Sequence, residues 1–268
     1  MSMRTLVMKF GGASVSSPKK FSLIADLILD RTLVYQNIVV VVSAMGDATD
    51  KLFSLARQVH EEPPRRELDM LLSVGERISI ALLAMALDKK GKRGVSLTGS
   101  QSGIITCNHH SDARILEVRP RRILENLSNG HIVIVAGFQG VSRQGEITTL
   151  GRGGSDTTAV ALGVALQAEK VEFFKDVSGI YEKDPKKDSN ATLFPSISYR
   201  DVLQILKGGA KVLHSRCVLL AEKNNLPLHV RSFEDRDLNQ GTFIGDFPRT
   251  NYTSFQYEAE VEEVHAPL

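Results

Sequence analysis

Lysines that stand beside glycine pairs are the first residues of this sequence that suggest a chemistry. Lys9 precedes one Gly-Gly pair, and Lys211 follows another at 208–209. Glycine lets backbone amides approach a phosphate without a Cβ in the way, and a nearby ammonium group can bind phosphate oxygens. Each segment taken alone is also explained as a turn or a helix end with a solvated lysine. Both explanations, a phosphate site and plain turns, stay open at this point.

A third glycine-rich segment, Gly151 to Asp156, precedes a predicted helix over 157–168. Backbone amides at the N-terminus of a helix point outward and favour anions. The spacing matches neither a Walker A loop nor the GxGxxG motif of dinucleotide-binding proteins. Asp156 alone is explained as an acidic residue that complements the helix dipole. The segment therefore indicates an anion site and leaves the ligand open.

Charged residues near strand and helix patterns add to this picture. Glu76 is a carboxylate within a largely apolar helix pattern, which indicates either an exposed helix face or a buried charge that needs a partner. Lys175 and Asp176 end a predicted strand, and alone the residues that follow are typical of turns. The histidines, including those at 109–110, show no HExxH pattern. Phosphoryl transfer needs aligned reactants and positive charge more than covalent help, and these residue types meet that need.

Strands that alternate with helices are predicted to position these segments. Apolar or β-branched runs predict strands at 4–10, 38–42, 132–136, 147–150, 171–174 and 228–230. Helical patterns begin at Ser17-Pro18 and at Ser198 with Asp201, and they cover 67–90 and 157–168. This alternation predicts an α/β fold with a mostly parallel sheet and helices on both faces. Glycine-rich loops follow several strands, at the edge where ligands bind in such sheets.

The composition is that of an ordinary soluble protein. The 268 residues are enough for one large α/β domain or two small ones, with 42% apolar and 24% charged residues. A net charge of +2 gives no support for nucleic acid as the main partner. Cys107 and Cys217 are far apart, which predicts reduced thiols. The first residues are too short an apolar run for a signal peptide, and Ile78–Leu87 is about half of a membrane span. We therefore expect a cytoplasmic protein that does not bind membranes.

Taken in order, the segments resemble the aspartate kinases of the amino acid kinase family. Lys9–Val15 reads KFGGASV and is similar to the family's KFGGTSV, Val41–Gly46 with Thr49 resembles VVSAMGxxT, and Ser73–Glu76 matches SVGE. Gly137–Gly140 and Thr148–Asp156 (TTLGRGGSD) match the family's most diagnostic stretch, Asp176–Pro185 resembles DVDGIYxxDP, and Gly209–Arg216 resembles GAKVLHxR. The match runs from about residue 9 to residue 244 in the family's order.

The resemblance implies a fold and a reaction. The expected fold is a three-layer α/β/α sandwich with a mostly parallel central sheet. A catalytic domain over 1–246 binds the amino acid in its N-terminal half and the nucleotide in its C-terminal half. The implied reaction transfers the γ-phosphoryl group of ATP, which carries Mg²⁺, to the side-chain carboxylate of L-aspartate. This step opens the pathway to lysine, diaminopimelate, threonine and methionine. The acceptor has a pKa of ~3.9 and is ionised at pH 7, so no general base is required.

The resemblance also assigns roles to residues. The catalytic residues are Lys9, Asp156 and Lys211. The aspartate site comprises Ser43, Thr49, Glu76, Arg152, Gly153, Gly154 and Ser155, in which Glu76 takes the α-amino group and Arg152 the α-carboxylate. The ATP site comprises Lys9, Phe10, Gly11, Gly12, Lys175, Asp176, Tyr181, Asp184, Pro185, Lys211 and Val212. No residue is expected to bind metal directly, and Asp156 orients the lysines and the hydration shell of magnesium through water.

Four positions depart from the family pattern. Ala13 and Lys175 stand where threonine is usual, Ser178 replaces an aspartate, and Ser215 replaces a proline. None of these changes removes a group assigned to the transfer step. Lys175 adds a positive charge beside the expected nucleotide site, where it alters affinity or base preference.

The length of the chain and its assembly lead to further expectations. Most aspartate kinases carry C-terminal ACT domains, but only 24 residues follow Ile244. We therefore expect a partly disordered tail over 247–268 and no feedback by lysine or threonine. Members of the family commonly dimerise, so a homodimer through the catalytic domain is expected. Two alternatives stay open: a related kinase for glutamate, acetylglutamate or UMP, and a non-catalytic ATP-binding regulatory subunit.

Overall fold

A computed structural model describes residues 4–183, 185, 188, 190–234, 240–246 and 255–258. The large sheet contains β1 (Thr5–Phe10), β2 (Asn37–Val42), β3 (Gly94–Leu97), β6 (Ile132–Ala136), β9 (Lys170–Lys175), β10 (Ser196–Ile197), β11 (Leu228–Ser232) and β12 (Thr242–Ile244). The small sheet contains β4 (Ile104–Thr106), β5 (Ile115–Val118), β7 (Gln139–Ser142) and β8 (Ile147–Thr149). The helices are α1 (Pro18–Thr32), α2 (Ala48–Val59), α3 (Arg65–Leu72), α4 (Val74–Asp88), α5 (Arg121–Ser128), α6 (Gly154–Ala165), α7 (Tyr199–Lys207) and α8 (Ser215–Lys223).

The strand order of the large sheet confirms the predicted α/β fold. Its strands follow the order β10-β12-β11-β9-β1-β2-β6-β3, and among the described strands β11 and β12 alone pair antiparallel there. The small sheet follows the order β5-β4-β7-β8. The predicted strands at 4–10, 38–42, 132–136, 171–174 and 228–230 all belong to the large sheet. The mostly parallel arrangement requires crossover helices, which cover both faces.

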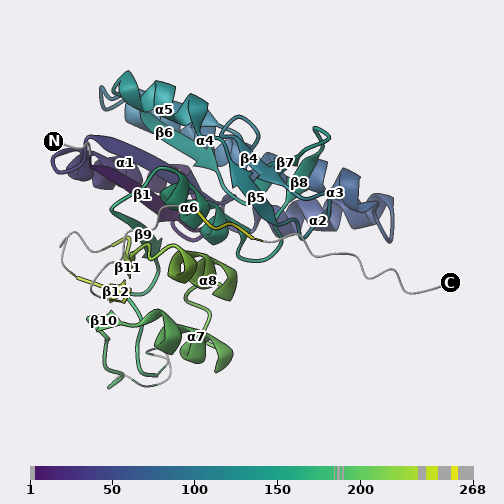
Figure 1. Cartoon of the computed structure of the whole chain (residues 1–268). Helices are drawn as coiled ribbons and strands as arrows, with labels where there is room; N and C mark the ends of the chain where they lie inside the picture. The colour runs from purple at the N-terminus through teal and green to yellow at the C-terminus, as the bar shows by residue number, and fades with distance from the viewer. Residues whose placement is uncertain are drawn as a thin grey trace.

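The alternating side chains of β2 show how the three layers form. Val39 and Val41 face a core shared with α5, α6 and α8, whereas Val40 and Val42 face a second core shared with α1 and α4. All four valines are fully buried. Successive side chains of a strand point to opposite faces, so a continuous β-branched run is the composition that two-sided burial demands. The fold is therefore the predicted α/β/α sandwich (Figure 1).

The predicted helix over 67–90 is a pair of helices, α3 and α4, that meet at Ser73. The carbonyl oxygen of Ser73 accepts a hydrogen bond from Nε2 of Gln139 at 2.8 Å, which ties the junction to the small sheet. By length and composition, residues 65–88 could cross a membrane. In the fold, however, α4 packs against α1, β3 and β6, and Leu83 and Leu87 are fully buried. The pair is therefore part of the core of this fold.

One predicted boundary near the glycine-rich segments was wrong. The helix predicted to begin at residue 157 begins at Gly154, because Gly153 adopts φ +71° and serves as its N-cap. Asp156 therefore lies in the first helical turn rather than in the preceding loop. Strand β7 begins at Gln139, within the segment 137–140. Helix α6 then runs under the large sheet, where ten of its residues are buried.

Candidate active site

The carboxyl ends of neighbouring parallel strands bring the predicted site residues together. Lys9 and Phe10 end β1, and Lys175 ends β9, which pairs with β1 in parallel. Ser43 directly follows β2, the neighbour of β1 on the other side. Parallel strands end at a common edge, so these side chains emerge beside the N-terminus of α6. The structure thus places these predicted residues at one edge of the sheet.

A triad of charged side chains occupies this edge. Nζ of Lys9 lies 2.5 Å from Oδ1 of Asp156, and Nζ of Lys175 lies 3.1 Å from Oδ2 of the same carboxylate. The side chains are 5%, 7% and 17% exposed for Lys9, Asp156 and Lys175. Two ammonium groups and one carboxylate leave a net charge of +1, which suits an anionic ligand.

Burial and mutual charge act on these groups in opposite directions. Burial lowers the pKa of Lys9, and the nearby Lys175 lowers it further, while Asp156 opposes both. Burial alone would raise the pKa of Asp156, but the two lysines outweigh it and lower the pKa to about 2. Asp156 therefore stays ionised at neutral pH and keeps a charge partner next to each lysine.

The glycine pair after β1 lies beside the buried Lys9 ammonium group. A Cβ at Gly11 would lie 3.6 Å from Nζ of Lys9, and one at Gly12 would lie 3.2 Å from the carbonyl oxygens of Ala44 and Gly46. The loop is held by the hydrogen bond from Ser14 N to Gly11 O at 3.0 Å. A side chain at Gly12 would crowd the neighbouring loop, whereas a Cβ at Gly11 would make an ordinary contact with the lysine.

The loop over 151–154 requires glycine at several positions. Gly151 and Gly153 both adopt φ +71°, in the left-handed region. A Cβ at Gly153 would overlap the side chain of His214, and one at Gly151 would lie 2.9 Å from Oδ1 of Asp112. A turn closes the loop through a hydrogen bond from Gly154 N to Gly151 O at 3.0 Å. We call residues 151–154 the glycine loop.

Glu76 is a buried carboxylate with one oxygen still available. Its Oε1 accepts a hydrogen bond from the amide of Ala44 at 3.0 Å, and Oε2 has no partner among the described residues. Glu76 is 3% exposed, and burial raises its pKa to about 7, although the Ala44 hydrogen bond and the Lys9 charge oppose this rise. A buried carboxylate with a free acceptor is completed by a cationic group of a ligand. Glu76 is therefore a buried group that needs a partner, and it does not lie on an exposed helix face.

Several other predicted residues are described by their burial and by their local contacts. Oγ of Ser43 and Oγ of Ser155 are 2.8 Å apart, which joins two predicted substrate-binding residues. Arg152 is exposed on the glycine loop, and Thr49 is half-buried near the start of α2. Lys211 is exposed and Val212 half-buried, on the segment that ends at His214 against Gly153. Asp176 is exposed, Tyr181 pairs with Leu193 in an isolated bridge, and Pro185 is half-buried. Asp184 lies outside the described residues.

Phe138 is a site residue that the sequence did not reveal. It directly follows Gly137 after β6 and adopts φ +69°, which is uncommon for a residue with a side chain. Its amide donates a hydrogen bond to Oγ1 of Thr158 at 3.2 Å. A Cβ at Gly154 would lie 3.1 Å from Cδ2 of its ring. Phe138 thus forms a wall behind the glycine loop in a strained conformation that the surrounding contacts maintain.

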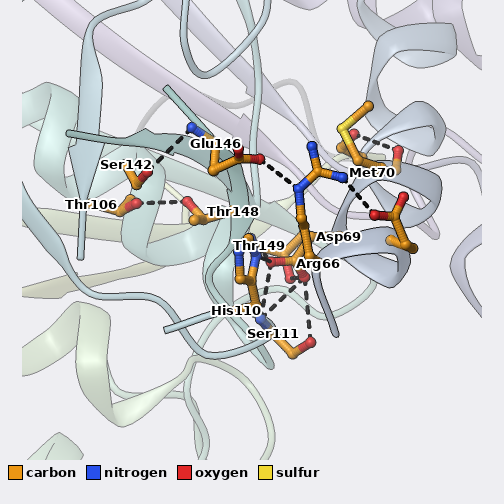
Figure 2. A network of polar contacts seen from close by, with 12 residues as sticks. Arg66, Asp69, Met70, Thr106, His110, Ser111, Ser142, Glu146, Thr148 and Thr149 are labelled. Atoms are coloured by element: carbon orange, nitrogen blue, oxygen red, sulfur yellow. Dashed lines mark hydrogen bonds and ion pairs between the residues drawn. The ribbon is translucent and has the colours of Figure 1, made fainter. Parts of the chain in front are cut away.

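A buried carboxylate on α3, also missed in the sequence, anchors the strand that precedes the glycine loop. Figure 2 shows Asp69 at the centre of this network, between His110, Ser111 and Thr149. Asp69 accepts hydrogen bonds from Thr149 Oγ1 at 2.6 Å, Thr149 N at 3.1 Å and Ser111 N at 3.1 Å, and lies 2.8 Å from Nδ1 of His110. Its side chain is fully buried. These bonds fix β8 and the loop at 109–112 to α3.

Comparison with known proteins gives a consistent result. The amino acid kinase family matches residues 4–232. An aspartokinase of Geobacillus stearothermophilus is 49% identical over 242 residues, and one of Mycolicibacterium smegmatis is 49% identical over 231 residues. These matches cover 90% and 86% of this chain but 59% and 55% of the relatives. The chain therefore spans less than two thirds of the length of the curated relatives it matches.

Solved structures show the same fold. The aspartate kinase from Synechocystis superposes with a TM-score of 0.80 at 43% identity, and the match covers 92% of this chain and 40% of that one. Aspartokinase III of E. coli, solved in complex with aspartate and ADP, superposes with a TM-score of 0.82 at 27% identity, and the match covers 92% of this chain and 65% of that one. UMP kinase from Bacillus anthracis has a TM-score of 0.67 at 21% identity, which shows a common fold alone.

Proposed function

The chain belongs to the amino acid kinase family, and we propose that it is an aspartate kinase, which transfers the γ-phosphoryl group of ATP to the β-carboxylate of L-aspartate. The similarity to aspartokinases at 49% identity supports this proposal. The observation that carries it is the pairing of two sites at one edge of the sheet. A buried carboxylate with a free oxygen, Glu76, lies near the triad of Lys9, Lys175 and Asp156. Such a pair of sites can bind an amino acid and a triphosphate side by side.

The proposed reaction needs positioning and positive charge. An oxygen of the substrate β-carboxylate attacks the γ-phosphorus, the bond to the bridging oxygen breaks, and ADP leaves with the electron pair. Lys9 and Lys175 stabilise the negative charge that moves to the ADP oxygens. The nucleophile is already ionised at pH 7, so no side chain has to remove a proton. The products are ADP and 4-phospho-L-aspartate, the first intermediate toward lysine, diaminopimelate, threonine and methionine.

The remaining site residues are assigned within this proposal. Glu76 binds the α-ammonium group and Arg152 the α-carboxylate, with Ser43, Thr49 and Ser155 around them. The N-terminal half of a catalytic domain over 1–246 thus holds the amino acid, and the C-terminal half holds the nucleotide. Lys211 contributes a further cation from the segment that touches Gly153 through His214. Phe10, Gly11, Gly12, Asp176, Tyr181, Asp184, Pro185 and Val212 complete the ATP site.

Magnesium enters the proposal as a companion of ATP. Both oxygens of Asp156 are engaged by lysine ammonium groups, at 2.5 and 3.1 Å. A magnesium ion carried by ATP would therefore be held near Asp156 through water, and it would supply positive charge to the phosphates beside that of the lysines. This arrangement divides the negative charge of the triphosphate between the metal and the protein.

The alternative acceptors differ in whether they carry an ammonium group. UMP has no ammonium group, and the amine of acetylglutamate is acylated, so neither neutralises the buried carboxylate of Glu76. L-glutamate keeps the ammonium group and is longer by one methylene. A buried charge without a partner is strongly unfavourable, so we favour a free amino acid as the acceptor and place L-aspartate first.

The test is an assay that traps the acyl phosphate as a hydroxamate, with L-aspartate or L-glutamate as acceptor. Because UMP forms no acyl phosphate, release of ADP is measured as well, with UMP as the third acceptor. We expect product with L-aspartate. Lys211→Ala should lose roughly 2–4 kcal/mol of transition-state stabilisation, as for other preorganised charge donors. Lys207→Ala, which removes a lysine in the last turn of α7, is the matched control. Binding of ATP without any acyl phosphate would favour the regulatory-subunit alternative instead.

We also propose a cytoplasmic homodimer. Supporting this assembly, exposed apolar side chains follow one another along α3 and α4, namely Met70, Val74, Ile78 and Met85, which are 42%, 39%, 48% and 65% exposed. A helical stripe of this kind is stabilised when a second copy covers it. Sedimentation of the wild type and of Ile78→Glu tests the proposal, since the charge should shift a dimer to monomer.

A further inference from the structure

The guanidinium group of Arg216 forms a junction between segments that are far apart in the chain. Its Nη1 donates to the carbonyl oxygen of Leu150 at 2.6 Å and to Oδ1 of Asp112 at 3.0 Å. Its Nη2 donates to the carbonyl oxygen of Ala113 at 2.9 Å and to Oε2 of Glu258 at 3.0 Å, and Nε donates to Oε1 of Glu258 at 2.8 Å. An arginine has five N–H donors, so every one of them is used here.

The acceptors of Arg216 lie at the base of the glycine loop. Leu150 directly precedes Gly151, and the amide of Ala113 donates to Thr149 O at 2.9 Å on the same strand end. On the other side, His214 lies two residues before Arg216 and packs against Gly153. The guanidinium of Arg216 thus forms a hydrogen bond just before the start of the glycine loop, and the side chain of His214 packs against its middle. Both contacts come from the beginning of α8.

Glu258 completes this junction from the C-terminal part of the chain. Besides its two bonds to Arg216, its Oε2 accepts a hydrogen bond from Ile115 N at 2.8 Å, and its own amide donates to Ile115 O at 3.0 Å. Gln256 exchanges two hydrogen bonds with Asn224, at 2.8 and 2.9 Å. In Figure 1 the short yellow segment near the C-terminus lies beside β5, in agreement with the Ile115 contacts. Residues 255–258 therefore cross from α8 to the small sheet.

The burial of this pair makes it more than a surface contact. The side chains of Arg216 and Glu258 are 20% and 11% exposed, and the pair is bidentate. Loss of the Glu258 charge would leave two of the five donors without their carboxylate in a partly desolvated position. The guanidinium would then move toward other acceptors or water, and its hydrogen bond to the carbonyl oxygen of Leu150 would be lost.

We propose that Glu258 is a positioning residue of the active site: through Arg216 it holds the glycine loop, 151–154, in the conformation that binds the amino-acid substrate. The catalytic part of this inference rests on the proposed function. Arg152 lies on this loop, two residues after Leu150. A displacement of the loop moves the guanidinium group of Arg152 relative to the substrate carboxylate. Lys9 and Lys175 lie on β1 and β9, so their positions do not change.

The kinetic test compares Glu258→Gln with Glu117→Gln. The control is matched, because Glu117 also lies by β5 and also forms a bidentate pair with an arginine, Arg119, but at an exposed position. For Glu258→Gln we expect the KM for L-aspartate to rise roughly tenfold or more, with the KM for ATP within about twofold of the wild type. Glu117→Gln should leave both values unchanged. An unchanged KM for L-aspartate, or an equal rise in both KM values, would overturn the proposal.

A second measurement does not depend on the reaction. Hydrogen exchange followed by mass spectrometry reports on the amides of Gly154 and Asp156, whose bonds close the glycine loop. In Glu258→Gln the peptide over 150–156 should exchange faster, while peptides from β1 and β9 keep wild-type rates. Identical exchange in the wild type and the variant would overturn the positioning role. A wild-type chain that is inactive on L-aspartate but shows the expected exchange difference would instead count against the proposed function alone.

Discussion

Lys9 and Lys175 bind the same carboxylate, each through a different oxygen of Asp156. The two ammonium groups come from neighbouring parallel strands and the carboxylate from the first turn of α6. Without Asp156 the two positive charges would repel each other in a largely buried site. With it, the site holds two cations in place and keeps a net positive charge for an incoming anion. This relationship leads to separate predictions for a lysine and for the aspartate.

Lys175→Thr restores the residue that is usual at this position in aspartate kinases. The change removes one cation next to the phosphates, and we expect the dissociation constant of ADP to rise roughly tenfold, the equivalent of one charge-assisted contact. Calorimetric titration at two salt concentrations measures both the affinity and its salt dependence, which should become weaker. Lys223→Thr, at an exposed lysine in the last turn of α8, is the control. Equal ADP affinity in Lys175→Thr and the wild type would show that Lys175 does not reach the nucleotide.

Asp156→Asn removes the shared carboxylate and leaves both lysines in place. We expect the free energy of unfolding to fall by about 3 kcal/mol, because the breaking of a buried ion pair leaves uncompensated charge. Urea denaturation at pH 7.5 measures this loss. The destabilisation should shrink at higher pH, since burial has already lowered the pKa of Lys9 and its deprotonation relieves the repulsion.

The control for this substitution is Asp47→Asn. Asp47 pairs with Lys51 at 3.0 Å, but the two side chains are 68% and 74% exposed, so this ion pair should contribute little. If Asp156→Asn is as stable as Asp47→Asn, the triad does not stabilise the fold, and its charges serve ligand binding alone.

Five of the eight described strands of the large sheet could be predicted, because burial on both faces demands a distinctive composition, whereas β3, β10 and β12 were missed. Residues 38–42 are a β-branched run, and they form an internal strand of the sheet, β2, between β1 and β6. In the small sheet the run at 147–150 predicted β8, whereas β4, β5 and β7 have only three or four residues each and were missed. Helix α2 was also missed, and its residues, all described, are at least partly exposed. Short, half-exposed elements depend on tertiary contacts rather than on local pattern.

The site could be predicted in its parts but not in its contacts. Strand ends and a helix start located Lys9, Lys175 and Asp156. The sequence does not show, however, that both lysines bind the carboxylate of Asp156. The positive φ of Phe138 arises from packing against the glycine loop and leaves no local signal. The tail over 247–268 was expected to be partly disordered, and its charged composition gave no sign that Glu258 binds Arg216. Such long-range pairs are decided by the fold as a whole.

Arg152→Lys tests whether a guanidinium group binds the α-carboxylate of the substrate through two hydrogen bonds. A guanidinium binds a carboxylate through two parallel hydrogen bonds, whereas an ammonium is a point charge. We expect the KM for L-aspartate to rise by roughly ten- to a hundredfold, with a small change in the KM for ATP. Arg143→Lys, an exposed arginine between β7 and β8, should behave as the wild type. A KM for L-aspartate that stays within error would assign the α-carboxylate to another residue.

Glu76→Gln should make the ligand-free protein more stable at alkaline pH while it abolishes binding of L-aspartate. Burial raises the pKa of Glu76 from 4.5 to about 7. The folded state therefore holds this proton more tightly than the unfolded chain, so stability is lost as the pH rises from 4.5 to 7. Above pH 7 the loss amounts to about 3 kcal/mol. Glutamine keeps the shape and the acceptor for Ala44 N, but it carries no charge to be desolvated.

Urea denaturation of the ligand-free proteins at pH 5 and pH 8 checks this prediction. The variant should exceed the wild type at pH 8, and most of the difference should disappear at pH 5. Glu125→Gln, at an exposed carboxylate on α5 that pairs with Arg121, should keep the wild-type pH dependence. L-aspartate should raise the melting temperature of the wild type at pH 8 and leave that of Glu76→Gln unchanged, because its ammonium group is the missing partner of Oε2. A variant that is less stable than the wild type at pH 8 would mean that the ionised carboxylate is already compensated within the protein, and the assignment of Glu76 to the substrate would fail.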